Sequence, residues 1–319
     1  MHVSSAAQRS RTEYTQRMNR VMDYIDSHLD GDIDLAALAD VAHFSPFHFH
    51  RLFAAWMGAT LGDYVRRRRL EVAALQLAGN TRISVLEVAL GVGFGSGEAF
   101  ARAFKLRFGQ SPSAWRADTP QRWAAELRGV RKLHQAESNL DQAGHSANGH
   151  HDAMSDSQSF FSMQVTLTTL PAVRVAYMRH VGPYGVPVNR FWTGTFLPWC
   201  FAQGLLPGAS SFGRGLDDPH ITAPEHCRYD GLVQVPDDFV APSPASMATL
   251  PGGRYAVAPF EGTVPQLTVA WTELLRDWLP ASGMKLDSRP LFEHMPPDAR
   301  YDAATGVMQC ELCIPVQPL

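Results

Sequence analysis

The chain has 319 residues, of which 45% are hydrophobic and 18% are charged, with 25 Gly, 22 Pro, 4 Cys and a net charge of −3. This composition excludes a collagen-like repeat, a disulfide framework and a largely disordered chain, and the length favours two domains. No stretch approaches the roughly 18 consecutive apolar residues of a membrane span, and the first residues lack a secretory apolar segment, so we expect a cytoplasmic protein without membrane partners.

The charge is distributed unevenly along the chain. Residues 1–132 carry 18 Lys and Arg against 13 Asp and Glu, a balance of +5. Residues 133–319 carry 10 against 18, a balance of −8. A basic first half favours contact with a polyanion such as DNA, although many helical domains of this charge bind no nucleic acid.

The N-terminal part has a helical pattern beyond residues 1–10, which we expect to be disordered. Apolar residues at three- and four-residue steps predict a first helix, and they are Met18, Val21, Met22, Ile25 and Leu29. That helix ends at Gly31, Asp34 caps a short second helix, and Ser45-Pro46 begins a third that ends at Gly58. Helix, short turn and helix is the geometry that places a recognition helix in the major groove of DNA.

The same unit occurs twice. A serine, two phenylalanines and an arginine recur at an offset of 51 residues, as Ser45, Phe49, Arg51, Phe53 and Ser96, Phe100, Arg102, Phe104. Between the copies, residues 61–78 predict one helix of roughly 27 Å, which approaches the ~34 Å between successive major grooves on one face of DNA. Its block Arg66–Arg69 is typical of a solvated helix face from which one or two arginines contact phosphate.

Residues 17–116 resemble the DNA-binding domain of AraC/XylS-type regulators. The most specific motif lies in the second copy and is Ala89-x4-Phe94-x5-Phe100-x3-Phe104-Lys105-x3-Gly109-x2-Pro112-x3-Arg116. Arg69-Leu70 matches the connecting helix of that family. The resemblance implies an all-α domain of two helix-turn-helix units that are joined by a long helix and bind double-stranded DNA.

The outward faces of the two recognition helices supply candidate DNA contacts. The residues expected to face the core are Phe49, Leu52, Phe53 and Trp56. Phe47, His50 and Arg51 then point outward near the helix N-terminus, and they match base-contacting positions of the family. The corresponding residues of the second copy are Gly97, Glu98 and Arg102. An Arg can pair with guanine, whereas Glu98 can accept from cytosine N4 or simply favour the helix N-terminus.

Residues 134–159 separate the two parts of the chain. They are rich in Ser, Ala, Gly, Asn, Asp and His and contain no aromatic residue, which predicts a flexible linker. We therefore expect an AraC-type domain over 11–133 and a second domain over 160–319. The pair His150-His151 is interpreted as part of the solvated linker rather than as a metal site.

The second half is also duplicated. Alternating apolar residues predict strands at 165–170, 173–178 and 228–236, with an aromatic helix at 189–201. Trp192 and Trp199 recur as Trp271 and Trp278 at an offset of 79 residues. These repeats predict an α+β domain of two strand–helix–strand–strand units with a cleft between its halves.

Residues 162–317 resemble the GyrI-like small-molecule-binding domain. The motifs that carry the resemblance are Arg179-His-Val-Gly-Pro-Tyr184, Pro224-Glu-x-Cys-Arg-Tyr-Asp230, Leu250-Pro-Gly-Gly-x-Tyr255, Phe292-Glu293-x2-Pro296 and Glu311-x3-Pro315. The resemblance implies a small-molecule effector. A DNA-binding domain followed by this domain resembles the Rob-like arrangement of transcription regulators.

The GyrI-like resemblance also implies candidate effector-binding residues. In that family a buried Glu of the Phe-Glu motif meets cationic, often aromatic, ligands, and this position is Glu293 here, with Glu311 as a second candidate. Ring faces add cation–π attraction. The family often has an aromatic residue where this chain has Met295, which counts against a cationic ligand. The aromatic residues expected to line the cleft are Tyr177, Trp192, Tyr229, Phe260 and Trp271.

These observations predict a ligand-responsive transcription regulator that binds promoter DNA, a small-molecule effector and RNA polymerase. We expect no cofactor and no metal, because Cys310 and Cys313 would lie on opposite faces of one strand. We also expect no catalytic residues, because no nucleophile–base pair stands out. Two alternatives stay open, in which the second domain is a small-molecule hydrolase or a protein-sequestering module fused to a DNA-binding domain.

Overall fold

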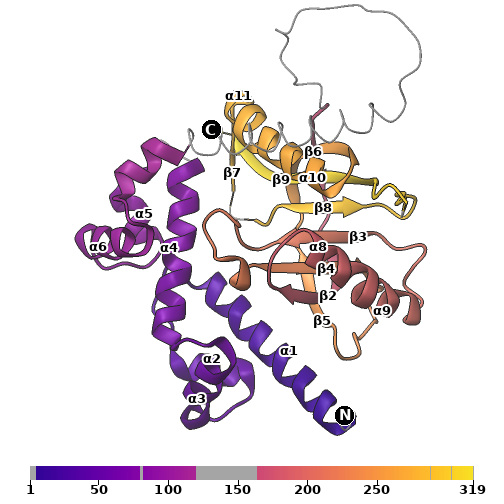
Figure 1. Ribbon diagram of the computed structural model, residues 1–319, viewed down its shortest axis with the longest axis horizontal. Helices are drawn as coiled ribbons and strands as arrows, with labels where there is room; N and C mark the ends of the chain where they lie inside the picture. Colours follow the sequence, from indigo (N-terminus) through magenta and orange to yellow (C-terminus); the bar gives the residue numbers. More distant parts are fainter. Residues whose placement is uncertain (1–4, 80–81, 120–163, 288, 303, 319) are drawn as a thin grey trace, which may run out of the picture. The chain divides into compact units, whose positions relative to one another are not determined.

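The computed structural model describes residues 5–79, 82–119, 164–287, 289–302 and 304–318 (Figure 1). The chain divides into two compact units, one made of Met1–Glu71 with Met163–Leu319 and the other of Val72–Ser162. The first helix-turn-helix therefore belongs to the same compact unit as the C-terminal domain, although the sequence repeat relates it to the second helix-turn-helix. The linker predicted at 134–159, the pair His150-His151 and the domain end predicted at 133 lie outside the described residues.

The helical part of the first unit begins with four helices. They are α1 (Ser5–Ser27), α2 (Leu35–Ala42), α3 (Pro46–Met57) and α4 (Leu61–Gly79). Helix α1 starts at Ser5, inside the stretch 1–10 that we expected to be disordered, and its first turns contain the helix-favouring residues Ala6, Ala7 and Gln8. The predicted helix-turn-helix corresponds to α2 and α3.

The turn between α2 and α3 is formed by short-range contacts. The Asp34 carboxylate accepts from the Ala36 N–H at 3.0 Å and caps α2 as predicted. His43 ends α2 in the left-handed region with φ of 54°, and Pro46 opens α3. Phe49 and Phe53 are fully buried with ring centroids 5.7 Å apart.

Trp56 departs from the pattern expected for α3, because its side chain is 40% exposed. It stacks on Tyr14 of α1 with ring centroids 6.2 Å apart. The core side of α3 is therefore narrower than predicted, since a ring of this size is satisfied by a neighbour at the surface.

The second unit contains the second helix-turn-helix. Its helices are α5 (Val85–Gly91) and α6 (Gly97–Phe108), followed by helical residues 112–119. The Ser96 hydroxyl accepts from the Ala99 N–H and caps α6, and Phe100 and Phe104 are fully buried. The Trp115 indole donates to the Ala74 carbonyl at 3.1 Å. The second copy thus repeats the buried phenylalanine pair of the first, as predicted.

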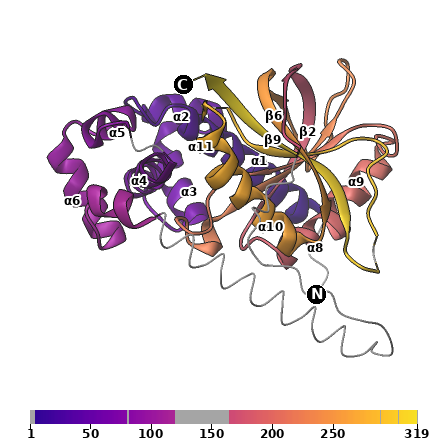
Figure 2. The same cartoon turned by 90° about the horizontal axis from the view of Figure 1, so that it is seen from above.

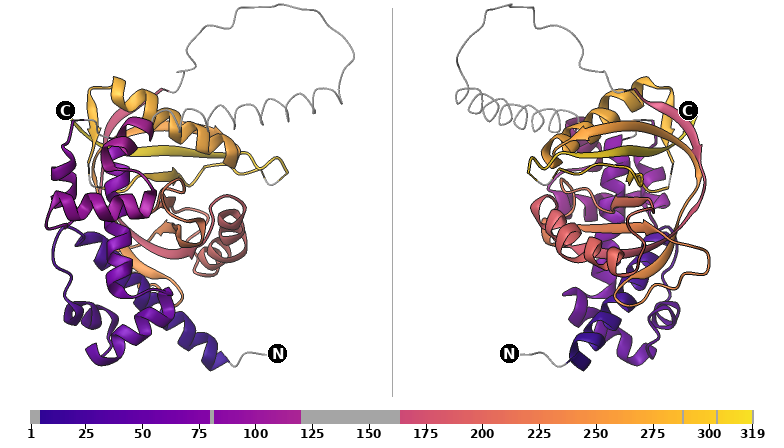
Figure 3. Two further views of the ribbon diagram at one scale, coloured as in Figure 1. Left: turned by 60° about the vertical axis from the view of Figure 1, so that its left-hand side comes forward. Right: turned by 90° about the vertical axis from the view of Figure 1, so that its right-hand side faces the viewer.

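The C-terminal domain is an antiparallel sheet, nine-stranded in the described residues, with two helical segments. The strands are β1 (Thr166–Leu170), β2 (Val173–Val181), β3 (Ser211–Gly215), β4 (Arg228–Gln234), β5 (Ser246–Leu250), β6 (Gly253–Gly262), β7 (Met284–Leu286), β8 (Phe292–Met295) and β9 (Met308–Pro318). Their order in the sheet is β1-β6-β9-β8-β3-β4-β2-β5, and β7 pairs with β9. Figure 3 shows that the sheet is curled.

The strand order confirms the predicted duplication. It is symmetric about the pair β8–β3, so that β9 and β6 of the second copy correspond to β4 and β2 of the first. The first strand of each copy pairs with the other copy, β1 with β6 and β5 with β2. Each copy begins with two strands before its helix, one more than the predicted strand–helix–strand–strand unit.

Both helical segments lie on the same face of the sheet, which we call the helix face (Figures 1 and 2). The first consists of α8 (Val186–Phe191), the π-helix η1 (Trp192–Phe196) and α9 (Leu197–Ala202). The second consists of α10 (Val264–Glu273), the π-helix η3 (Leu274–Trp278) and α11 (Leu279–Ala281). A separate cluster that includes Tyr177, Tyr255 and Phe292 covers the opposite face.

Candidate functional site

Glu293 lies on β8 at the junction of the two sequence repeats. In the sheet it pairs with Gly213 of β3 on one side and with Leu312 of β9 on the other. Leu312 packs in the hydrophobic cluster beneath α10 and η3. Because paired residues of neighbouring strands share a face, the Glu293 side chain projects from the helix face.

Three aromatic side chains connect to the Glu293 carboxylate through hydrogen bonds. The Tyr229 hydroxyl donates to Oε2 at 2.8 Å, and the Trp271 indole donates to Oε1 at 3.1 Å. The Trp192 indole donates in turn to the Tyr229 oxygen at 3.3 Å. The structure thus brings together four of the residues proposed from the sequence, and we call Trp192, Tyr229, Trp271 and Glu293 the Glu293 group.

The Glu293 group follows the internal symmetry of the domain. Trp192 and Trp271 are counterparts at the repeat offset of 79 residues, and each donates an indole N–H toward the centre. Trp192 comes from η1 of the first copy and Trp271 from α10 of the second. The duplication therefore places one tryptophan on each side of a single Tyr–Glu pair.

The electrostatics of the group favour a ligand that supplies positive charge. Burial raises the pKa of Glu293, and the hydrogen bonds from Tyr229 and Trp271 lower it only in part. Burial and the neighbouring Glu293 raise the pKa of Tyr229 well above 10, so this residue stays a hydroxyl donor. A cation placed beside the carboxylate would stabilise its charged form and meet the aromatic faces around it.

Gly213 is a component of the site that the sequence analysis missed. A Cβ at this position would overlap the Tyr229 hydroxyl and Glu293 Oε2. Gly213 faces Glu293 directly across β3 and β8 and is its counterpart at an offset of 80 residues. That repeat relation was the signal that could have identified it, because two side chains cannot share the point where the repeats meet.

The other proposed effector residues lie elsewhere. Phe260 of β6 is partly buried against the cluster beneath α10 and η3. Glu311 precedes Leu312 on β9 and so points to the opposite face, where its carboxylate lies 2.8 Å from His294 Nδ1. Tyr177 also lies on the opposite face, and its hydroxyl donates to Asp23 of α1 at 2.9 Å. The structure does not bring Glu311 or Tyr177 to Glu293.

The proposed DNA-contacting residues occupy the first turns of α3 and α6. His50 and Arg51 are exposed on α3, as are Glu98 and Arg102 on α6. Gly97 opens α6 and is half-buried near Leu86. Phe47 lies in the first turn of α3, and the described side chains do not include it. The polar candidates that are described are therefore accessible.

The arginine block of α4 is not a solvated face as the sequence suggested. Arg66 is exposed, but Arg68 is buried with only 5% of its surface accessible. Arg67 pairs with Glu71 at 3.1 Å, and Arg69 donates to the Gly31 carbonyl at 2.6 Å. The consecutive positions point in different directions around the helix, so a run of four arginines cannot share one environment.

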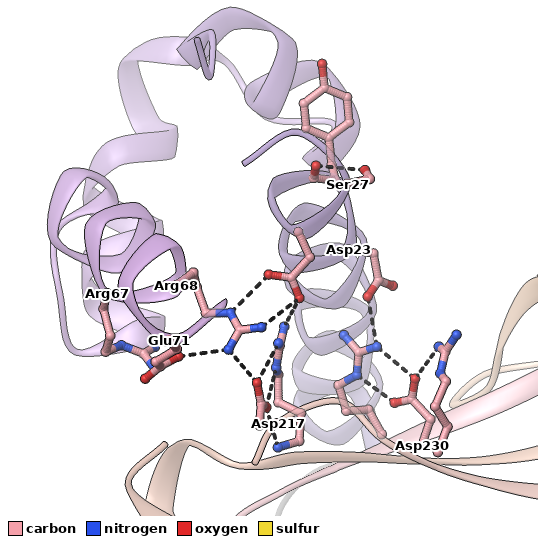
Figure 4. Close-up of polar contacts among 12 residues, drawn as sticks. Asp23, Ser27, Arg67, Arg68, Glu71, Asp217 and Asp230 are labelled. Carbon is pink, nitrogen blue, oxygen red and sulfur yellow. Dashed lines mark hydrogen bonds and ion pairs between the residues drawn. The ribbon is translucent and has the colours of Figure 1, made fainter. Parts of the chain in front are cut away.

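Arg68 belongs to a buried set of charges that we call the ionic cluster (Figure 4). Its members from the first helix-turn-helix are Asp23, Asp26, Arg67, Arg68 and Glu71, and its members from the C-terminal domain are Arg179, Arg214, Asp217, Arg228 and Asp230. Five positive groups thus meet five negative groups. Both contributing parts belong to the same compact unit.

The centre of the ionic cluster is Asp217. Its carboxylate accepts from the Arg228 N–H at 2.8 Å, from the Arg228 guanidinium at 2.9 Å and 3.0 Å, and from Arg68. Arg228 also lies 2.7 Å from the Asp26 carboxylate. Burial alone would raise the pKa of Asp217, but the two arginines more than offset it, and the pKa lies below its usual value.

A second part of the ionic cluster surrounds Asp230. Arg179 donates to both carboxylate oxygens of Asp230, at 2.7 Å and 2.9 Å, and Arg214 donates at 2.6 Å. Arg179 also lies 2.8 Å from Asp23 of α1. Burial acts to raise the pKa of Asp230, and the two arginines hold it below its usual value.

The cysteines are placed as predicted. Cys310 packs on the helix face and Cys313 in the cluster of the opposite face, because residues three apart on a strand point in opposite directions. Within the described part of the chain, no group of three or more His, Cys, Asp and Glu side chains could hold a metal ion. Among the same residues, none of the helices is long and apolar enough to cross a membrane.

Comparison with known proteins identifies relatives of both halves. A helix-turn-helix domain model matches residues 38–118, and a GyrI-like small molecule binding domain model matches residues 163–317. YosT of Bacillus subtilis, an SPbeta prophage-derived protein, is 31% identical over 156 residues, which are 49% of this chain and all of that protein.

Two further relatives are named as regulators. Regulatory protein SoxS of Salmonella typhimurium is 30% identical over 103 residues, which are 32% of this chain and 95% of that protein. Transcriptional regulator Rob of the same organism is 35% identical over 102 residues, which are 32% of this chain but only 34% of Rob. The chain therefore belongs to the AraC-type helix-turn-helix transcriptional regulators that carry a GyrI-like small molecule binding domain.

Proposed function

We propose that this regulator binds promoter DNA through α3 and α6 and responds to a lipophilic cation that binds at the Glu293 group. The observation that carries the effector part is the Glu293 carboxylate, buried against two indoles and a phenol that donate hydrogen bonds to or toward it. A carboxylate in aromatic surroundings attracts a cation with apolar substituents more than a neutral or anionic molecule.

The DNA-binding part of the proposal rests on the two faces of α3. Phe49 and Phe53 are fully buried, while His50 and Arg51 are exposed on the same helix. An arginine at the start of a recognition helix can pair with the O6 and N7 atoms of guanine. We extend the same role to Phe47 and, on α6, to Gly97, Glu98 and Arg102 as the positions that approach the bases.

Arg51→Ala is expected to weaken binding to the specific site by about 1–3 kcal/mol and to relax base preference at one position. The site would first be selected from random duplexes, and affinities would then be measured by fluorescence anisotropy on the selected site and its single-base variants. Arg254→Ala is the matched control, because it removes an equal charge from an exposed residue of β6. Unchanged base preference in Arg51→Ala would exclude Arg51 from base recognition.

Glu293→Gln is expected to weaken a cationic ligand by about tenfold or more while leaving a neutral analogue nearly unaffected. Tetraphenylphosphonium and triphenylphosphine oxide form a suitable pair for calorimetry, because they share phenyl rings and differ in charge. Since burial raises the pKa of Glu293, acidification should weaken the cation in the wild type and not in the variant.

Glu311→Gln provides the control for this measurement, because Glu311 is a carboxylate on the opposite face, beside His294. Equal weakening of both ligands in Glu293→Gln would mean that Glu293 shapes the domain rather than selects charge. A cation affinity that does not change at all would place the ligand elsewhere.

We further infer that the C-terminal domain binds its ligand without converting it, that the protein contacts RNA polymerase and that it acts in the cytoplasm, where promoter DNA lies. The naming of SoxS and Rob as regulators supports binding over catalysis. Mass spectrometry of the ligand after incubation tests this point, since a hydrolase would consume it. A protein-sequestering module would instead retain a stoichiometric protein partner.

A further inference from the structure

We propose that β4 transmits effector binding at the Glu293 group to the first helix-turn-helix through the ionic cluster. This inference rests on the proposed function, because it takes the Glu293 group as the effector site. It adds the route by which that site reaches the DNA-binding helices. The route lies entirely within the compact unit that contains α1 to Glu71 of α4 together with the C-terminal domain.

The first step of the route is the alternation of three consecutive residues on β4. Successive side chains of a strand point to opposite faces of the sheet. Tyr229 points to the helix face and donates to Glu293 at 2.8 Å. Its neighbours Arg228 and Asp230 point to the other face, where both belong to the ionic cluster. A displacement of Tyr229 along or across the strand therefore moves two buried charges.

The second step is the contact between these charges and α1. Arg228 lies 2.7 Å from Asp26, and Asp230 reaches Asp23 through Arg179, which lies 2.8 Å from the Asp23 carboxylate. Tyr177 donates to Asp23 at 2.9 Å from the same sheet face. The two aspartates of α1 are thus bound to β4 and its neighbour β2, and they follow these strands.

A third contact holds α4 to the same place. Arg68 binds Asp26, Glu71 and Asp217, and Asp217 accepts from the backbone and side chain of Arg228. A buried ion pair keeps its energy only when its geometry and its other hydrogen bonds are intact. The helices and the strand are therefore expected to shift as a unit rather than to slide past each other.

The last step connects α1 to the recognition helix. Arg17, which precedes Asp23 by six residues on α1, donates to the carbonyl of His43 at 3.0 Å. His43 is the residue of left-handed conformation that ends α2 and sets the direction of the turn into α3. A tilt of α1 therefore changes the turn from which α3 starts.

A ligand can use this route because it competes with an existing contact. A cation that pairs with Glu293 weakens the hydrogen bond from Tyr229, so the bound and free states differ in how β4 is held on the helix face. A ligand shifts a conformational equilibrium only through such a difference in contacts. The coupling should be reciprocal, so that DNA binding changes the affinity for the cation by the same factor.

The first experiment needs no ligand. Tyr229→Phe removes the hydroxyl that joins β4 to Glu293, and hydrogen exchange of the full-length protein then reports on α1. We expect faster exchange around Asp23 and Asp26 in this variant. Tyr255→Phe is the control, because it also removes a buried tyrosine hydroxyl, one that donates to the Pro251 carbonyl at 2.8 Å. Wild-type exchange of α1 in Tyr229→Phe, or an equal change in both variants, would overturn the proposal.

The second experiment measures coupling directly. In the wild type, saturating tetraphenylphosphonium is expected to change the Kd for DNA by about 5- to 150-fold, and Asp23→Asn/Asp26→Asn should bring this factor within about twofold of one. Asp30→Asn/Asp32→Asn removes the same charge from exposed residues after α1 and should keep the wild-type factor. Coupling that persists in Asp23→Asn/Asp26→Asn contradicts the route.

The two experiments separate the route from the proposed ligand. If calorimetry shows no binding of tetraphenylphosphonium to the wild type, the proposed cation preference is wrong, and hydrogen exchange in Tyr229→Phe still decides whether β4 is coupled to α1. If the cation binds and α1 does not respond to either perturbation, the effector site stands and the route is wrong.

Discussion

Gly213→Ala is expected to abolish the effector site while a neighbouring glycine tolerates the same change. A methyl group at position 213 would overlap the Tyr229 hydroxyl and Glu293 Oε2, and both side chains would have to move. The loss of their hydrogen bond and of the cation's carboxylate should weaken cation binding by about 10- to 100-fold. Overpacking of this kind also lowers the free energy of unfolding, by about 1–3 kcal/mol.

The control for this prediction is Gly215→Ala on the same strand. A Cβ at position 215 would lie 3.4 Å from the Tyr184 hydroxyl, an ordinary contact distance. Calorimetry with tetraphenylphosphonium and urea unfolding of both variants make the comparison. If Gly213→Ala binds the cation like the wild type, Glu293 and Tyr229 do not form the site.

Asp217→Asn should cause the largest loss of stability, because it leaves two buried arginines without their shared anion. The side chain of Asp217 is fully buried and accepts from Arg228 and Arg68. Removal of one partner of a buried ion pair typically costs about 3–5 kcal/mol. Urea unfolding followed by tryptophan fluorescence measures the loss, and Asp238→Asn, in the exposed loop after β4, should leave the free energy of unfolding within about 0.5 kcal/mol of the wild type.

The pH dependence of stability distinguishes the ionic cluster from a packing effect. The pKa values of Asp26, Asp217 and Asp230 are all lowered in the folded state, by arginines that outweigh the opposing effect of burial. The unfolded chain therefore binds protons more readily, so the wild type should lose stability as the pH falls below about 5 and through the folded pKa values. Asp217→Asn should show a shallower acid dependence, because one of these carboxylates is gone. An unchanged slope would mean that Asp217 contributes by shape alone.

The features that the sequence alone determined are those set by local periodicity. The helix-turn-helix was predictable because Phe49 and Phe53 recur at helical spacing and because Asp34 and Pro46 carry cap and first-turn preferences of their own. The opposite faces of Cys310 and Cys313 followed from the two-residue period of a strand. Spacing of this kind depends on near neighbours, which the sequence contains.

The duplication carried the prediction further, to part of the site. Trp192 and Trp271 were paired by their offset of 79 residues, and in the structure they donate indole hydrogens to Tyr229 and Glu293. A repeat predicts symmetric placement without knowledge of the strand register. It does not predict which side chain occupies the junction, so the need for glycine at position 213 appeared only with the pairing of β3 and β8.

The tertiary structure alone decided the environment of each charge. Arg68 lies in a run of four arginines that looks solvated, yet it binds Asp217, which is 149 residues away in the chain. Tyr177 and Glu311 have the residue types of an effector site, but the register of their strands turns them to the face opposite Glu293. Helical and strand periods limit which residues share a face, but they do not say which distant segment will cover that face. That choice depends on contacts that form only when the chain has folded, because burial and ion pairing are properties of both partners.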